Sequence, residues 1–188
     1  MSWLSAIVGY TAVLIAVLLR KGDAMLGWWA FCLLMQIPDV LEWRGIRLGL
    51  QPDLRIARLA FWLNILQPVA ALVATSAQTQ RVDALSVGVI CVYLANILYS
   101  APPIQIGRPN TECSHLKYKW WHKALPISLY FISTLVCLRT LPAHLLHRNA
   151  FIFIGSALLS ALTVKPCGIA SVWCWSVCVI AVLNIFTR

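Results

Sequence analysis

The chain has 188 residues, of which 61% are apolar and only 11% charged, and its mean hydropathy is +0.80. A soluble domain is about 45–50% apolar and about 25% charged, so one small core could not bury this much apolar surface. The composition excludes a cytosolic enzyme, a DNA-binding module and a disordered tail, and it predicts a protein of the lipid bilayer. The net charge is +9. Because no run of five basic residues occurs, we expect anionic lipid rather than nucleic acid as the counter-charge.

Seven apolar segments follow one another, separated by charged or Pro- and Gly-containing connections. Each is close to the ~20 residues that a helix needs to cross a membrane. The expected spans are 2–19, 24–43, 58–78, 84–101, 121–138, 149–164 and 170–187. The sixth is short and ends at Lys165-Pro166, so six spans are the alternative. The sequence therefore predicts an all-α integral membrane bundle of seven, or six, transmembrane helices in a single domain over 1–188.

Basic residues at the span ends predict the orientation, because Lys and Arg favour the cytosolic side. Nine of them lie in the even-numbered connections and six in the odd-numbered connections and at the C-terminus. We therefore expect the N-terminus in the cytosol. The first apolar segment begins almost at Met1 without a basic stretch before it, so we expect a retained helix rather than a cleaved signal.

The second span carries three polar side chains on one helical face. Gln36, Asp39 and Glu42 follow one another at intervals of three residues, which places them within about 120° on a helix. Ionisable groups at membrane depth are costly and face the bundle interior or a wet cavity. We therefore expect these three side chains to point inward.

The third span carries Asn64 and Gln67 one turn apart. Because it runs antiparallel to the second span, distances from the basic connection between them can be compared. At 1.5 Å rise per residue, Asp39 is expected level with Asn64, and Gln36 level with Gln67.

Asn96 in the fourth span and Trp173 in the seventh reach a similar depth. We call the full set the polar layer, and its members are Gln36, Asp39, Glu42, Asn64, Gln67, Asn96 and Trp173.

Two interpretations of the polar layer remain open. In one, its side chains are interhelical glue that hydrogen-bonds across helices, and Glu42 pairs with Arg44 or Arg47 at the interface. In the other, the layer lines a cytosol-facing vestibule for a ligand or ion. The three prolines Pro38, Pro68 and Pro126 would then open their helices and free backbone carbonyls.

Asp39 separates the two interpretations. It lies about 6 Å inside the nearest interfacial residue, where a carboxyl loses water and the charged form is disfavoured. Such a group is either buried with a partner or passes a cation or proton.

The connection 44–58 is expected to lie among lipid headgroups. Arg44 with Arg47, and Arg55 with Arg58, recur as i, i+3 pairs between aliphatic residues. Basic residues alternating with apolar ones are typical of a segment at the membrane surface. We therefore interpret these four arginines as a binding site for anionic lipid.

No residues are assigned to catalysis, a metal or a cofactor. The chain has no phosphate-binding G-x-x-x-x-G-K loop, no G-x-S-x-G motif and no H-E-x-x-H motif. His144 and His147 are expected to be solvated in an external loop.

The function hypothesis is a small channel or transporter. The alternatives are a structural subunit of a larger membrane assembly, with a homo-oligomer possible in either case, and a membrane-embedded enzyme or receptor.

Four short motifs carry a resemblance to a group of known proteins. They are Gln36-x-x-Asp39-x-x-Glu42-Trp43, Asn64-x-x-Gln67-Pro68, His115-Leu116-x-x-x-Trp120 and Ser171-x-Trp173-Cys174. In these four places, spread across most of the chain, it resembles small uncharacterised multispanning membrane proteins of large DNA viruses and protists. The resemblance implies a multispanning membrane fold, and it implies no activity.

Overall fold

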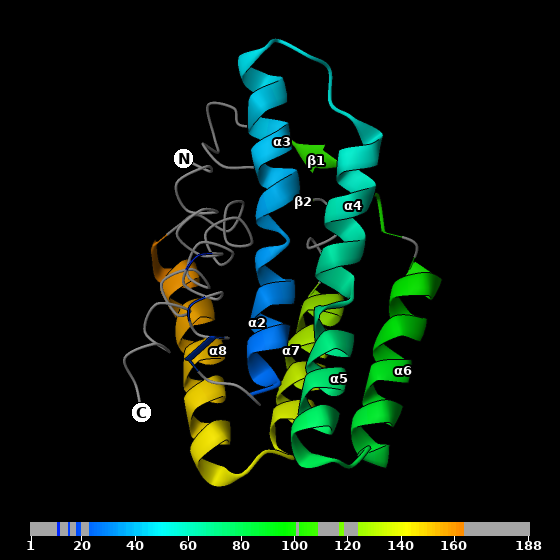
Figure 1. The fold of residues 1–188 in the computed structure, drawn as a ribbon. Helices are drawn as coiled ribbons and strands as arrows, with labels where there is room; N and C mark the ends of the chain where they lie inside the picture. The colour runs from blue at the N-terminus through cyan, green and yellow to red at the C-terminus, as the bar shows by residue number, and fades with distance from the viewer. Residues whose placement is uncertain are drawn as a thin grey trace.

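The computed structural model describes residues 11, 15, 18–19, 23–100, 102–108, 117–118 and 124–163. These residues are mostly helical, so the predicted all-α class is confirmed (Figure 1). In chain order the elements are α2 (Met25–Leu33), α3 (Gln36–Arg47), α4 (Leu54–Ile65), α5 (Gln67–Thr79), α6 (Ala84–Ser100), β1 (Ile106–Gly107), β2 (Lys117–Tyr118), α7 (Ala124–Leu138) and α8 (Ala143–Thr163).

The helices run roughly along one common direction (Figure 1). Helix α7 packs against α5, α6 and α8, while α2 packs against α5 and α3 against α4. The α3–α4 connection lies at one end of the bundle, and the α5–α6 and α7–α8 connections lie at the opposite end. The helices therefore have two distinct ends, and the buried hydrophobic core draws residues from α2, α4, α5, α6, α7 and α8.

Three predicted spans, 58–78, 84–101 and 121–138, fall on α4 with α5, on α6 and on α7. The span 24–43 covers α2 and most of α3. The spans 24–43 and 58–78 are therefore each a broken helix rather than a continuous one. The predicted span 2–19 lies largely, and 170–187 entirely, outside the described residues.

The sixth predicted span begins too late. Helix α8 begins at Ala143, six residues before the expected start at 149. His144 and His147 are exposed as expected, but they lie in the first turns of a helix and not in a loop. Their helical position arises because Pro142 precedes α8 and the Pro142 carbonyl accepts the N–H groups of Leu145 and Leu146, both at 2.9 Å.

The basic connection 44–58 is also more helical than expected. Helix α3 continues to Arg47 and α4 begins at Leu54, so the arginines occupy terminal helix turns. Gly49 adopts a left-handed φ of 65°, a conformation that glycine reaches without a Cβ clash and that commonly ends helices. The Asp53 side chain then accepts the Arg55 N–H at 2.7 Å and caps α4.

A two-residue strand pair lies near the same end of the bundle (Figure 1). Strand β1 pairs antiparallel with β2, with Ile106 opposite Tyr118 and Gly107 opposite Lys117. Ile106 is buried and belongs to the hydrophobic core. This pairing anchors residues 102–108 against the helices and so determines where Arg108 lies.

None of the described helices is, taken singly, both long and apolar enough to cross a membrane. Helices α4 and α5 meet that requirement together, with a bend of 41° at the break between them. Helix α6 and residues Leu125–Leu138 of α7 are apolar but shorter.

Two ion pairs lie at the end of the bundle opposite the α3–α4 connection. Arg148 binds Asp23 at 2.6 Å, joining α8 to the start of α2. Arg139 binds Asp83 at 2.9 Å, joining the end of α7 to the start of α6. The Ala24 N–H also donates to the Gln78 side chain at 2.8 Å. These contacts hold the helix ends in register across the bundle.

Asp83 caps the N-terminus of α6. Its Oδ2 accepts the Ser86 hydroxyl at 2.6 Å and the Ser86 N–H at 2.8 Å. These two hydrogen bonds, followed by the attraction of Arg139, lower the pKa of the Asp83 carboxyl below its ordinary value. The carboxylate therefore stabilises the fold above its unfolded-state pKa, and that stabilisation is lost as pH falls through the folded-state pKa.

We predict that Asp83→Asn lowers the thermal unfolding midpoint at pH 6. Because the wild-type advantage depends on the ionised carboxylate, the difference between the two proteins should shrink as the pH falls below about 4. Thermal unfolding followed by circular dichroism between pH 6 and pH 2.5 measures this. A difference that is constant over the whole range would contradict the capping role of the charge.

Candidate functional site

Five members of the polar layer are buried together in the α3, α4 and α5 region. Their exposed fractions are 4% for Asp39, 2% for Glu42, Asn64 and Gln67, and 1% for Gln36. Helix α3, which carries three of them, packs against α4, and α4 contacts α5. Almost none of their surface is accessible to water.

Two helix breaks position the glutamines. Gln36 is the first residue of α3, directly after the turn at Leu34 and Met35, and Gln67 is the first residue of α5, directly after Leu66. At each break the glutamine begins the second helix. The two amide side chains therefore occupy corresponding places in two antiparallel broken helices.

Proline chemistry explains the first break. Pro38 has no N–H with which to bond the Leu34 carbonyl four residues earlier, and its ring crowds that carbonyl. The Leu34 carbonyl instead accepts the Ile37 N–H at 3.0 Å. The preceding N–H groups of Leu34 and Met35 also bond three residues back, at 3.1 and 3.3 Å. This short 3₁₀-like stretch ends α2.

The second break has the same cause. Pro68 cannot donate to the Asn64 carbonyl, and α4 ends just before it, where the Leu66 N–H donates to the Trp62 carbonyl at 3.0 Å. The helix resumes when the Ala70 N–H donates to the Leu66 carbonyl at 2.9 Å. Pro38 and Pro68 thus lie beside helix breaks, as the vestibule interpretation expects.

Pro126 does not open its helix. It is the third residue of α7, and α7 continues without a break to Leu138. A proline in the first turn of a helix is tolerated because its N–H would have no intrahelical acceptor there. The carbonyl that Pro126 would free belongs to residue 122, which lies outside the described residues, so that expectation stays a prediction.

Gln67 is tied to the centre of the bundle. The Tyr130 hydroxyl of α7 donates to Gln67 Oε1, and both residues are fully or almost fully buried. The Tyr130 ring also lies near the rings of Tyr93 and Phe153, with centroid distances of 6.3 and 6.2 Å. This contact joins the polar layer to the aromatic core. In the sequence, the only sign of this role is a phenol inside an apolar segment, which does not by itself identify Gln67 as its partner.

Glu42 has a different partner from the one expected. Its Oε1 receives Arg108 Nε at 2.7 Å, and Arg108 also donates to the Leu50 carbonyl. The expected pairing with Arg44 or Arg47 is therefore wrong. Arg108 reaches the carboxylate because β1 holds residues 102–108 beside the end of α3, whereas the two nearer arginines are exposed.

Several buried polar atoms near the layer have no hydrogen-bond partner among the described residues. They are Asn64 Nδ2, Asn96 Oδ1, Tyr93 Oη and Ser133 Oγ. A buried donor or acceptor without a partner costs about 1–3 kcal/mol. These four atoms lie on α4, α6 and α7.

Two members of the polar layer are not placed with the other five. Asn96 lies on α6, which packs against α7 and α5, and its side chain is half-buried. Trp173 lies outside the described residues. Their membership in the layer therefore stays a prediction.

The four arginines assigned to lipid are all exposed. Arg44 and Arg47 lie in the last turns of α3, and Arg55 and Arg58 lie in the first turns of α4. Within the described part of the chain, no acidic side chain forms an ion pair with any of them. Four unneutralised charges therefore lie at the end of the bundle that carries the α3–α4 connection.

The structure contains a second buried polar contact that the sequence did not predict. Trp29 Nε1 donates to Asn149 Oδ1 at 2.8 Å, and Asn149 Nδ2 donates to the Leu145 carbonyl at 2.8 Å. This pair joins α2 to α8. It satisfies both polar side chains locally, so we assign it to packing rather than to the polar layer.

Comparison of the chain with models of protein families, with curated proteins and with solved structures gives no match. The function must therefore be argued from the geometry of this molecule.

We predict that Arg108→Gln destabilises the fold by about 2–3 kcal/mol, because it leaves the buried Glu42 carboxylate without a cation. The double variant Glu42→Gln/Arg108→Gln should recover part of this loss, since two neutral amides can hydrogen-bond to each other. Denaturant unfolding in detergent measures both.

The matched control is Arg55→Gln, which removes an exposed arginine and should change the free energy of unfolding by less than about 0.5 kcal/mol. Equal effects of Arg108→Gln and Arg55→Gln would show that the buried ion pair does not stabilise this end of the bundle.

Proposed function

We propose that the chain is a multi-pass integral membrane protein that acts as a small channel or transporter with a cytosol-facing polar vestibule. The observation that carries the proposal is the buried carboxyl of Asp39 on α3, in a region where both antiparallel helix pairs, α2 with α3 and α4 with α5, are broken beside a proline. Discontinuous helices around buried polar groups are how many transporters build ion and substrate sites at the membrane midplane.

The distribution of side chains supports the membrane setting. Large apolar residues face outward on several helices, among them Tyr99 at 92%, Leu162 at 84% and Phe151 at 80% exposed. The amides and carboxyls of the polar layer described above face inward. Water would favour the opposite arrangement, and exposed apolar surface of this extent is typical of contact with lipid or another protein.

In this proposal, the arrangement described above is the closed state of the protein. The polar side chains are almost inaccessible, and the Glu42–Arg108 ion pair lies at the end of α3 where the vestibule would meet the cytosol. Passage of an ion therefore requires an opening there. The Leu34 and Asn64 carbonyls, which lose their donors four residues later to Pro38 and Pro68, would then use their remaining lone pairs as ligands, since irregular backbone is tolerated where it lines a cavity.

We predict that Asp39→Asn lowers ion or proton flux in proteoliposomes by at least about tenfold while the protein stays folded. Asparagine keeps the size and hydrogen bonding of the side chain but removes its charge. Flux is measured with pH-sensitive and cation-sensitive dyes inside the vesicles, and folding with the melting temperature.

The matched control is Asp53→Asn. Asp53 is an exposed aspartate that caps α4, and asparagine caps helices equally well, so its flux should equal that of the wild type. If Asp39→Asn melts at an unchanged or higher temperature with undiminished flux, Asp39 is packing glue. The structural subunit then becomes the better account of the protein.

We further predict that the basic residues at the ends of α3 and α4 bind anionic lipid. Each exposed basic residue near a membrane surface contributes about 1 kcal/mol with anionic lipid. Arg47→Glu/Arg55→Glu should therefore lose most of the thermal stabilisation that the wild type gains when anionic lipid replaces neutral lipid in mixed micelles.

The charge-preserving variant Arg47→Lys/Arg55→Lys should keep that stabilisation and serves as the control. An equal gain for the wild type and the charge-reversed variant would rule out a lipid contact at this connection.

A further inference from the structure

A short segment of chain lies at the α3–α4 end of the bundle and is held there from two sides. Residues 102–108, which we call the strap, include β1 near the end that carries the α3–α4 connection (Figure 1). Ile106 anchors the strap, because it is buried in the hydrophobic core and pairs with Tyr118 of β2. Two residues further on, Arg108 joins the strap to α3.

The inward face of α3 provides the place where Arg108 binds. Gln36, Asp39 and Glu42 follow one another at intervals of three residues, and the next position in that series is Gly45. Gly45 has no side chain, and a Cβ added there would lie 3.5 Å from Arg108 Nη2. The guanidinium therefore lies against the backbone where a side chain at position 45 would otherwise project. Arg108 thus continues the polar face of α3 from outside the helix.

Arg108 connects three parts of this end of the bundle. Its Nε donates to Glu42 Oε1 at 2.7 Å, and its Nη1 donates to the Leu50 carbonyl. Glu42 belongs to α3, and Leu50 belongs to the connection that follows it. One side chain therefore holds together the strap, the end of α3 and the α3–α4 connection.

The contact lies between the α3–α4 connection and the middle of the polar layer. Glu42 is one turn from Asp39, about 4.5 Å along the helix on the side of the connection. The Glu42 side chain is 2% exposed, whereas that of Arg108 is 25% exposed. Along α3 from the connection inward, Gly45 with the Arg108 guanidinium comes first, then Glu42, and then Asp39.

Two features of the contact favour one that opens over a permanent one. Arg108 Nη2 is buried and has no hydrogen-bond partner among the described residues, which costs free energy in the closed arrangement. The guanidinium also binds Glu42 through Nε alone, so it lacks the two parallel hydrogen bonds of the strongest arginine–carboxylate pairs. Release of Arg108 into water would satisfy all three of its nitrogens and offset part of the lost ion pair.

We propose that the strap is a gate at the α3–α4 end of the polar layer, and that the Glu42–Arg108 ion pair is the latch that keeps it closed. When the latch breaks, Arg108 leaves Gly45, and the polar face of α3 becomes accessible from this end. The inference rests on the vestibule of the proposed function and names the contact that must break for that vestibule to open. It does not depend on which ion passes.

The first experiment measures access to the polar layer with a thiol introduced on α4. Asn64→Cys places the thiol in the layer itself. Ala60→Cys places it one turn nearer the α3–α4 connection, at a buried position where the change adds only a thiol group. The full chain in lipid nanodiscs is treated with a charged methanethiosulfonate reagent, and peptide mass spectrometry gives the labelling rate at the introduced cysteine. Two reporters allow the test to proceed if either one does not fold.

The latch is removed by Glu42→Gln/Arg108→Ala, which leaves no buried charge without a partner. Each reporter should then be labelled at least about tenfold faster, because loss of a charge-assisted hydrogen bond raises the open population by at least that factor. The matched control is Asp83→Asn/Arg139→Ala, which removes an ion pair at the opposite end of the bundle. It should leave the labelling rate within about twofold of that with both ion pairs intact, since distant sites act independently. No acceleration, or equal acceleration by both double variants, overturns the proposal.

The second experiment displaces the guanidinium without changing either charged residue, and it needs no introduced cysteine. Gly45→Leu extends a side chain beyond the Cβ position that already lies 3.5 Å from Arg108 Nη2, so Arg108 must move. Gly88→Leu is the matched control, because a Cβ added at this exposed glycine of α6 meets no atom within 4 Å. Leucine favours a helix more than glycine does, so both variants should keep their helices.

Hydrogen–deuterium exchange is then measured for the peptide that covers the strap. It should be at least about tenfold faster in Gly45→Leu than in Gly88→Leu, because exchange follows the population in which the strap is released. Equal exchange in the two variants overturns the proposal.

Neither experiment uses ion flux, so the two proposals fail separately. Labelling that depends on the latch, in a protein that moves no ion, leaves the gate and removes the transporter. Flux in a protein whose labelling does not depend on the latch removes the gate and leaves the transporter.

Discussion

Burying a polar side chain in an apolar bundle is costly unless it finds a hydrogen-bond partner, and this constraint shapes the contact between α5 and α7. The contact from Tyr130 to Gln67 is its clearest expression, because it joins α7 to the first residue of α5 within the core. Gln67 directly follows the break at Leu66, where the helix changes direction by 41°. The bend of α4 against α5 and the position of α7 therefore depend on each other.

The two ends of the bundle are built differently. At one end, Asp23 and Asp83 neutralise Arg148 and Arg139 and bind together the ends of four helices. At the other end, Arg108 is the only arginine among the described residues there with a carboxylate partner. The four exposed arginines of α3 and α4 keep their charge. The first end is held by paired charges, whereas the second presents free positive charge to whatever surrounds it.

Sequence reasoning placed the helices and the inward face of α3 well, because hydropathy and a spacing of three residues depend only on neighbours in the chain. The inward direction of Gln36, Asp39 and Glu42 needed no tertiary information.

The partners of these residues could not be predicted in the same way. Arg108 is 66 residues from Glu42, and Tyr130 is 63 residues from Gln67. Contacts over such separations depend on packing, as does the strand pair that carries Arg108 to its place. Pro126 shows the limit of a local rule, since a proline breaks a helix only when it lies beyond the first turn.

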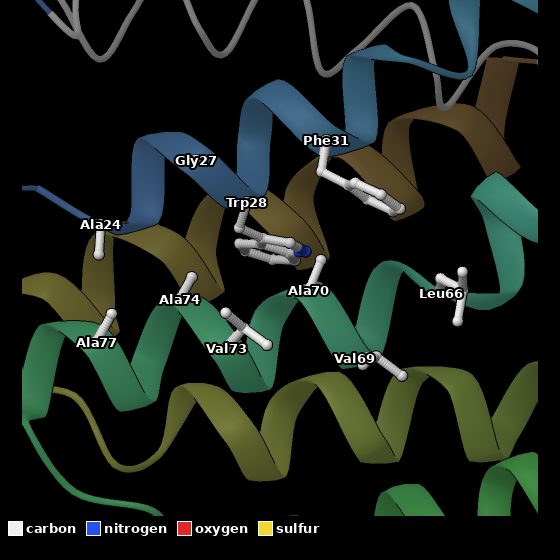
Figure 2. A pocket seen from close by; sticks show the side chains of 10 residues that line it. All are labelled: Ala24, Gly27, Trp28, Phe31, Leu66, Val69, Ala70, Val73, Ala74 and Ala77. Atoms are coloured by element: carbon white, nitrogen blue, oxygen red, sulfur yellow. The ribbon is translucent and has the colours of Figure 1, made fainter.

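The α4–α5 break joins the outer surface of the bundle to its polar core. Leu66 lines an apolar groove between α2 and α5 (Figure 2), and the next residue, Gln67, accepts the hydroxyl of the buried Tyr130. Any movement of this break changes the wall of the groove and the geometry of the polar layer at once, because the two residues share one turn of backbone. The packing of α2 against α5 and the hydrogen bond from Tyr130 to Gln67 therefore depend on the same break in the helix.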